Sequence, residues 1–127
     1  MPASDPNPDR SRNVAKGRRF ETLAGEFFEN NNYQILEQNW QAGHKEIDLI
    51  VRKNNLIVFV EVKSASNRKF GHPAERVDKK KIRNLTIAAQ QYLLVNDLKG
   101  VDFRFDLVTF LDGQLEHYPD AFEAMDE

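Results

Sequence analysis

Two carboxylates and a lysine in neighbouring apolar segments are the residues of this sequence best suited to chemistry. Asp48 lies in the first segment, and Glu61 and Lys63 lie two residues apart in the second. Carboxylate oxygens, with water completing the shell, are ligands that Mg²⁺ and Mn²⁺ prefer. A lysine ammonium beside such an ion can contact a phosphate oxygen or an ion-bound water. The set therefore fits hydrolysis of a phosphodiester bond.

Two antiparallel strands must position these side chains, and we expect them over residues 46–52 and 56–63. Asn54-Asn55 separates the strands, and asparagine tolerates the positive φ that a two-residue turn requires. If Lys53 pairs with Leu56, one face of the hairpin is wholly apolar and must be buried. A slip of one residue would mix the two faces, so the pattern favours this register. The opposed pairs on the apolar face are then Ile47 with Val62, Leu49 with Val60, and Val51 with Val58.

The same register places Asp48 opposite Glu61, and Glu46 opposite Lys63, on the other face. The Cβ atoms of opposed residues are about 5 Å apart. Two carboxylates at that distance repel each other, and a bound divalent cation would remove the conflict. The pattern also allows a second interpretation, in which Glu and Lys form ordinary cross-strand pairs on a polar sheet face.

A helix over residues 13–30 is expected to precede the strands, because its apolar residues recur at helical spacing. Gly17, Glu21 and Gly25 share one stripe of this helix. Glycine inside a helix costs about 1 kcal/mol relative to alanine, so two glycines there indicate close approach to another backbone or to a ligand. Glu21 could point toward the hairpin and assist with the metal, or it could be a surface glutamate beside Arg18.

The remaining elements complete an α/β sandwich on a mixed sheet. We expect a strand over residues 33–40, a second helix capped by Asp78 and running to about residue 96, and strands over residues 101–111 and 114–118. Pro119 is expected to start a short terminal helix. Arg104 and Asp106 share a face of one strand and are expected to form a structural salt bridge. We expect Tyr33, Trp40, Phe103 and Phe105 to serve in packing, and His44 and His117 have no partner at ligand spacing.

Size and composition describe one cytoplasmic domain. The chain has 127 residues, of which 40% are hydrophobic and 30% are charged, and it contains no cysteine. Disulfides and thiolate metal sites are therefore excluded. The first residues lack the apolar core of a secretory signal, and no run approaches the roughly 18 apolar residues of a membrane span. We expect residues 1–12 to be disordered and residues 13–127 to form a single domain.

Positive charge is concentrated in two blocks, although the net charge is -2. The local field, not the total charge, determines phosphate binding, so the blocks indicate either nucleic-acid contacts or two solvated faces. Three adjacent lysines at residues 79–81 cannot share one helix face, so at least one of them is expected to be solvated. The residues of the second block expected to contact nucleic acid are Arg68, Lys69, Lys79, Lys81 and Arg83.

Several short motifs resemble the YraN-like family of uncharacterised bacterial proteins. They are Gly17-Arg-Arg-Phe-Glu21, Glu46-Ile-Asp-Leu-Ile50, Phe59-Val-Glu-Val-Lys63 and Arg104-Phe-Asp106-Leu-Val108. That family is similar to the PD-(D/E)xK nuclease superfamily, and especially to archaeal Holliday junction resolvases. The resemblance implies a restriction-endonuclease-like αβββαβ core with a mixed central sheet flanked by helices.

The resemblance also implies roles for individual residues. Asp48, Glu61 and the main-chain carbonyl of Val62 would bind Mg²⁺ or Mn²⁺, Lys63 would be the catalytic lysine, and Glu21 would match the helix glutamate of the resolvases. Lys45 replaces a glycine of the family and adds positive charge beside Asp48, so we expect it to contact nucleic acid. Ala65 replaces a basic residue and removes one phosphate contact.

The function expected from these observations is metal-dependent hydrolysis of DNA, including branched or structured DNA in repair or recombination. A non-catalytic module that keeps the nuclease fold and binds nucleic acid or a protein is the alternative. A homodimer would place two sites on a symmetric junction, as in the resolvases.

Overall fold

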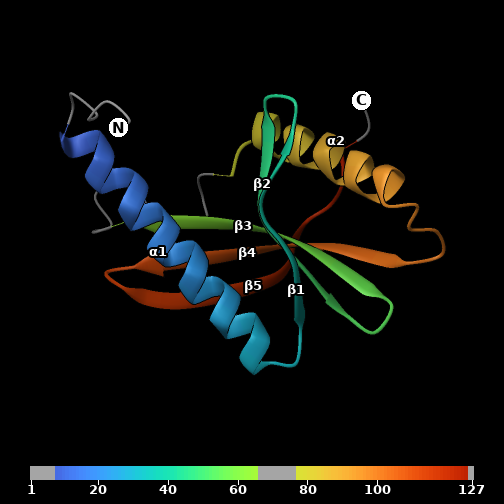
Figure 1. The fold of residues 1–127 in the computed structure, drawn as a ribbon, viewed down its shortest axis with the longest axis horizontal. Helices are drawn as coiled ribbons and strands as arrows, with labels where there is room; N and C mark the ends of the chain where they lie inside the picture. The colour runs from blue at the N-terminus through green and yellow to red at the C-terminus, as the bar shows by residue number, and fades with distance from the viewer. Residues whose placement is uncertain (1–7, 66–76, 126–127) are drawn as a thin grey trace, which may run out of the picture.

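The computed structural model describes residues 8–65 and 77–125, without the side chains of residues 8–16. Two helices and five strands lie within these ranges (Figure 1). Their order matches the order expected from the sequence, and most boundaries agree within two residues. The elements are α1 (Pro8–Asn30), β1 (Gln34–Ala42), β2 (Lys45–Lys53), β3 (Leu56–Ala65), α2 (Lys79–Val95), β4 (Asp102–Leu111) and β5 (Gln114–Phe122).

The five strands form one mixed sheet in the order β1-β2-β3-β4-β5. Among the described strands, β3 and β4 run parallel, and the other neighbouring pairs are antiparallel. A parallel pair requires a crossover connection, and α2 lies in that connection. The arrangement is a mixed α/β fold with two helices, compatible with the expected restriction-endonuclease-like core.

The two helices cover opposite faces of the sheet, and each buries its own apolar cluster. Ala24 and Phe28 of α1 pack with alternate residues of β2, β3 and β4, including Val58 and Val60. On the other face, α2 residues pack with Ile57 and Phe59. Because successive side chains of a strand point to opposite faces, β3 is apolar at nearly every position and is buried on both sides. This doubly covered strand is the one that carries Glu61 and Lys63.

The predicted register of the central hairpin is confirmed from Leu49–Val60 to Lys53–Leu56. Asn54 has the positive φ of 55° that the turn requires. The recorded strand pairing ends at Leu49, where β2 leaves β3 and rises toward α2 (Figure 1).

The prediction of one apolar face on the central hairpin is wrong at Ile47. Leu49 and Val51 pack beneath α1 as expected, but Ile47 packs with Ile50 and Phe59 on the α2 side. The strict alternation of a flat strand breaks at Asp48, because β2 separates from β3 there and turns over the other helix. Asp48 therefore lies at the point where the two strands diverge.

Two chain ends differ from the sequence-based expectation. The described part of the first helix begins at Pro8, five residues before the predicted start. Of the segment expected to be disordered, residues 8–12 are therefore helical, and residues 1–7 lie outside the described ranges. The predicted helix at Pro119 is also wrong, since Pro119 lies within β5. The β4–β5 register shifts beside it, and a bulge on an edge strand needs no N–H from proline.

Within residues 8–65 and 77–125, no helix combines the length and the apolar content needed to cross a lipid bilayer.

Of the two glycines singled out in α1, Gly25 is buried against β1: a Cβ there would lie 3.0 Å from Cδ1 of Ile35. This glycine therefore allows the close helix–sheet approach that the sequence indicated. A Cβ at Gly17 would meet nothing within 4 Å, and the structure does not explain that glycine.

Candidate active site

Two carboxylates meet where β2 separates from β3. Asp48 Oδ2 accepts a hydrogen bond of 2.8 Å from the backbone N–H of Val62, which fixes the carboxylate against β3. Glu61 is only 3% exposed, and its Oε2 atom is buried without a hydrogen-bond partner in the described part of the chain. An unsatisfied buried carboxylate oxygen is costly, so this atom is a position at which a cation would be favourable.

Two lysines approach the other oxygen of Glu61. Lys63 Nζ lies 3.8 Å from Glu61 Oε1, and Lys81 Nζ lies 3.4 Å from the same atom. Strand periodicity puts Lys63 on the same side as Glu61. Lys81 comes from α2, whose start is set by Asp78, because the Asp78 side chain accepts a hydrogen bond from the Lys81 N–H. One strand and one helix therefore bring two ammonium groups to the carboxylate pair.

Burial raises the pKa values of both carboxylates. The pKa of Glu61 is raised from 4.5 to about 7, mainly by burial and next by the charge of Asp48. Burial also raises the pKa of Asp48, although the hydrogen bond from Val62 and the charge of Lys81 oppose the shift. Two interacting carboxylates with raised pKa values are typical of a functional site.

Glu61 is expected to destabilise the folded protein when it ionises. A raised folded pKa contributes stability below the unfolded pKa, and this contribution is lost as the pH rises through the folded value. In the presence of EDTA, the free energy of unfolding of Glu61→Gln relative to wild type should increase on the order of 2 kcal/mol from about pH 5 to about pH 8. Urea denaturation at several pH values measures this difference.

Glu29→Gln, in the exposed last turn of α1, is the matched control for that experiment. Its difference from wild type should stay nearly constant over the same pH range. A constant difference for Glu61→Gln as well would contradict the raised pKa of Glu61.

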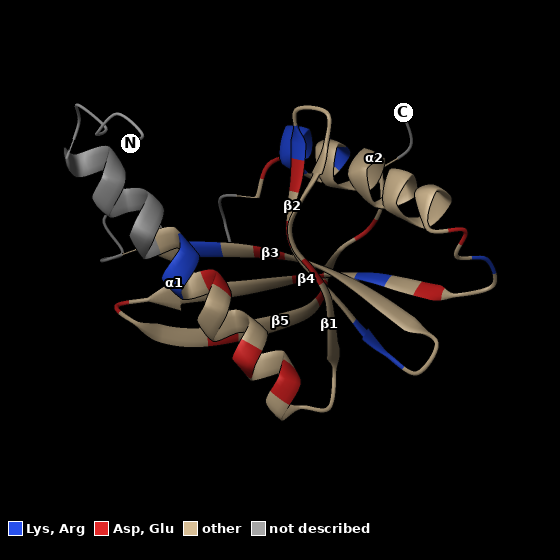
Figure 2. Ribbon diagram, viewed as in Figure 1, with Lys and Arg blue, Asp and Glu red and all other residues tan. Residues whose placement is uncertain are grey.

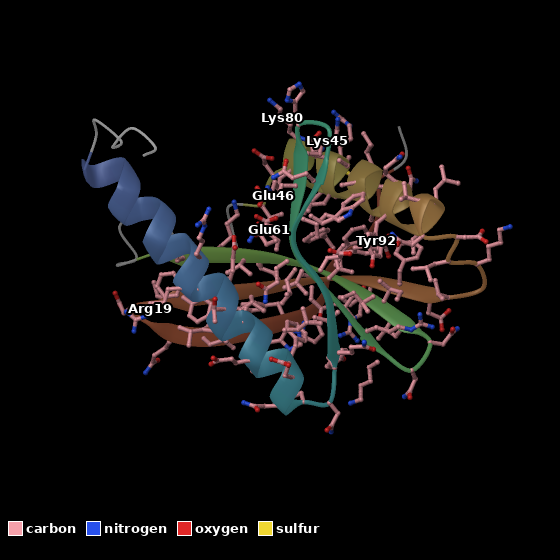
Figure 3. The ribbon with its side chains drawn as sticks, in the orientation of Figure 1. Arg19, Lys45, Glu46, Glu61, Lys80 and Tyr92 are labelled. Atoms are coloured by element: carbon pink, nitrogen blue, oxygen red, sulfur yellow. The ribbon has the colours of Figure 1, made fainter. Side chains whose placement is uncertain are left out.

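The half-buried Glu21 of α1 is the third acidic residue at the site. Burial raises the pKa of Glu21, and so do the charges of Asp48 and Glu46, while a hydrogen bond with the Asn39 side chain lowers it. Glu21 therefore lies within electrostatic reach of Asp48, and its expected role with a metal stays a prediction. Glu46, near the start of β2, joins this electrostatic cluster and lies beside Glu61 in Figure 3.

The side chains of the site are suited to supply part of the ligand shell of a hard divalent cation. Across residues 8–65 and 77–125, His, Asp and Glu side chains form no group of three or more that could hold a metal ion by themselves. The unpartnered Oε2 of Glu61 and the carboxylate of Asp48 supply two hard oxygen ligands. Mg²⁺ usually keeps several waters and is held by one or two carboxylates together with substrate phosphates, so the pair is compatible with it.

Basic residues surround a groove of about 270 Å³ beside the carboxylates. Lys63, Lys80, Lys81, Asp78 and Asn84 line it. The start of α2 carries positive charge, in contrast to the acidic C-terminal half of α1 (Figure 2). A helix N-terminus and lysines together favour a phosphate group.

The other predicted nucleic-acid contacts are placed differently. Lys79 and Arg83 are exposed on α2 and do not line that groove, whereas Lys45 is half-buried at the start of β2. Arg68 and Lys69 lie outside the described residues. Lys80, which sequence reasoning did not select, does line the groove.

A second polar cluster lies under the C-terminal end of α1. Asp106 is fully buried, and Arg104 donates to both of its oxygens at 2.7 and 2.8 Å. His117 Nε2 lies 2.7 Å from Oδ2, and the Asp120 N–H donates to Oδ1 at 3.0 Å. Although burial opposes it, these hydrogen bonds lower the pKa of Asp106. The expected Arg104–Asp106 salt bridge is confirmed, and His117 is an additional partner.

Sequence reasoning missed several neighbours of the site. The contact of Lys81 with Glu61 was not foreseen, because it depends on how α2 is placed against β3. Asn39, which approaches Glu21, has a positive φ of 52°, a conformation that asparagine adopts more readily than most residues. Lys80 and Asn84 are four residues apart on one face of α2, and that helical spacing could have indicated a shared surface.

The sequence of this chain is similar to those of several known proteins. A profile of the uncharacterised protein family UPF0102 matches residues 20–110. A UPF0102 protein of Chloroherpeton thalassium is 46% identical over 99 residues, which cover 78% of this chain and 77% of the relative. A UPF0102 protein of Persephonella marina is 40% identical over 108 residues, with coverages of 85% and 93%. The matched range includes every carboxylate and lysine of the site.

Proposed function

This chain belongs to the uncharacterised protein family UPF0102, and from the geometry of its site we propose that it is a metal-dependent nuclease that hydrolyses phosphodiester bonds in DNA. UPF0102 is the YraN-like family that the motifs resemble, and it is PD-(D/E)xK nuclease-like. The family match alone assigns no activity. The proposal rests on the pair formed by half-buried Asp48 and buried Glu61, in which one oxygen of Glu61 has no partner among the described residues and the other faces two lysines.

Each residue of the site has a role under this proposal. Asp48, Glu61 and the carbonyl of Val62 would hold Mg²⁺ or Mn²⁺. When bound, such an ion supplies Lewis-acid chemistry, lowering the pKa of water and neutralising phosphate charge. Lys63 stabilises negative charge on the phosphate, and the charge of Lys81 favours the ionised form of Glu61. Glu21 would assist with the metal from a position near Asp48, whose charge raises the pKa of Glu21.

Cleavage of a panel of DNA substrates tests the proposal. The protein is incubated with duplex, single-stranded, flapped and four-way-junction DNA in Mg²⁺, in Mn²⁺ and in EDTA. We expect cleavage of at least one branched substrate with either metal, and none in EDTA. Calorimetric titration of Mg²⁺ and Mn²⁺ into the protein, with and without DNA, tests ion binding separately. Absence of both cleavage and ion binding would favour a non-catalytic module.

The adjacent lysines of α2 offer a matched test of phosphate contact. Lys80→Ala removes a charge that lines the groove, whereas Lys79→Ala removes an equal charge that does not. We expect Lys80→Ala to weaken DNA binding in EDTA by about fivefold and to reduce the slope of log affinity against log salt by about one. Fluorescence anisotropy at several salt concentrations measures both quantities. Equal losses in the two variants would indicate only a diffuse positive field.

The proposed function also includes a cytoplasmic location and a homodimeric assembly. A cytoplasmic protein that acts on symmetric junctions would be expected to work as a homodimer, with one site on each strand. Sedimentation of the protein with and without a four-way junction would report that assembly.

A further inference from the structure

A second groove, of about 430 Å³, lies between the tip of the β1–β2 hairpin and α2. This volume is within the range of roughly 300–1,000 Å³ that small-molecule sites occupy. Trp40, Gln41 and Lys45 line it from the hairpin, and Ile87, Gln91 and Val95 line it from the helix. The groove therefore combines an aromatic ring, two amides and a cation with an apolar floor.

The same face of α2 continues from this groove to the active site. Lys80, Asn84, Ile87, Gln91 and Val95 follow one another at spacings of three and four residues, so they form one stripe along the helix. The first two line the groove beside Glu61, and the other three line the hairpin groove. Lys45 and Lys80 lie toward the same end of the molecule (Figure 3). A chain of phosphates could thus run between Lys80 on α2 and Lys45 on β2 while its bases enter the hairpin groove.

Trp40 is placed to contact a base. It is half-buried, and its ring meets that of Tyr92 edge-on, with centroids 5.2 Å apart and planes at 90°. The packing role expected from the sequence is confirmed, because Trp40 packs against the apolar cluster beneath α2 while part of its side chain stays exposed. The ring also lines the groove, beside amides that can donate and accept hydrogen bonds.

We propose that this groove binds an unpaired base of a single-stranded segment that adjoins the phosphate held at the active site. The inference rests on the proposed nuclease function and specifies its substrate as nucleic acid with unpaired bases. A base within a duplex is stacked and paired, so an aromatic ring in a groove reaches it only after it leaves the stack. Lys45 and Lys80 match the charge of the adjoining phosphates, and base–aromatic stacking needs no particular sequence.

Trp40 is the only tryptophan of the chain, so its fluorescence reports directly on this groove. Wild-type protein is titrated in EDTA, where no cleavage is expected, with a short single strand, with the same strand lacking its bases, and with a fully paired duplex. Anisotropy of a labelled strand measures binding independently. We expect the single strand to quench Trp40 emission by about half or more, and the other two ligands to leave it nearly unchanged.

Two neighbouring glutamines provide the matched variants. Gln91 lines the hairpin groove, whereas Gln90 is exposed and lines a different, smaller pocket on α2. Gln91→Ala should weaken single-strand binding by about fivefold and reduce the maximal quenching, whereas Gln90→Ala should match wild type. Both variants retain Trp40 and its contact with Tyr92, so both are expected to fold.

Four outcomes would overturn the inference. Strands that bind without quenching Trp40, or that quench it equally with and without bases, would exclude base stacking in the groove. No binding of any strand would exclude it as well. Emission that depends on protein concentration, and not on nucleic acid, would assign the groove to a second copy of the chain. Cleavage assays with Mg²⁺ decide the nuclease function separately, so either proposal can fail without the other.

Discussion

Asp48→Asn is expected to abolish divalent-metal binding and to reduce DNA cleavage by at least about a thousandfold, the size of effect that loss of metal-ion catalysis predicts. The asparagine amide oxygen can still accept the hydrogen bond that Val62 donates to Asp48, so the local backbone should be preserved. The variant removes one of the two negative charges that would hold the cation under the proposed function. Calorimetry with Mn²⁺ and single-turnover cleavage measure the two losses.

Asp97→Asn is the matched control, because Asp97 is exposed beyond the far end of α2 and pairs only with Lys99 in the described structure. It should bind metal and cleave DNA as wild type does. Lys63→Ala separates the steps further, since it should lose cleavage while keeping metal and DNA binding. If Asp48→Asn cleaved DNA normally, the carboxylate pair would not be the metal site.

The second large effect concerns stability. Asp106→Ala should lower the free energy of unfolding at pH 7 by about 3 kcal/mol, because it leaves buried partners unpaired. Arg104 loses two hydrogen bonds, and His117 and the Asp120 N–H lose one each. The guanidinium is about a quarter exposed and can regain some hydration, which keeps the loss toward the lower end of such effects. Urea denaturation measures the change.

The same variant should show a defined pH dependence. A carboxylate with a lowered folded pKa contributes stability above its unfolded pKa of about 3.9, and this contribution is lost as the pH falls through the folded value. The difference between wild type and Asp106→Ala should therefore shrink below about pH 4. Asp102→Ala, at an exposed position of the same strand, is the control and should change stability by less than about 0.5 kcal/mol. A loss that persisted undiminished in acid would contradict the ionic role of Asp106.

The hairpin register was predictable from the sequence because two local patterns agree. Asn54 at a two-residue turn and the apolar residues shared by one face of both strands favour one pairing, and the structure contains it. Period-2 geometry then placed Lys63 on the side of Glu61. The helices were also predictable, since Asp78 is a strong N-cap and the apolar positions repeat at helical spacing.

Features that depend on tertiary placement were not predictable in this way. β2 turns away from β3 because the β1–β2 hairpin packs along α2. This turn moves Ile47 to the apolar cluster on the α2 side. Lys81 contacts Glu61 only because α2 connects the parallel strands β3 and β4 and is placed against β3. His117 reaches Asp106 only because β5 pairs with β4. No local pattern in one segment contains information on such pairs.

Both outer strands of the sheet carry an irregularity, and this affects how the protein meets copies of itself. The register of β1 shifts between Ile35 and Glu37, and that of β5 shifts beside Pro119. Regular, exposed edge strands can template edge-to-edge pairing and aggregation, and bulges and prolines oppose it. The two open edges are therefore poor sites for extending the sheet into a second molecule. If this protein forms a dimer on DNA, the two copies are expected to meet through side-chain surfaces and not through a continuous intermolecular sheet.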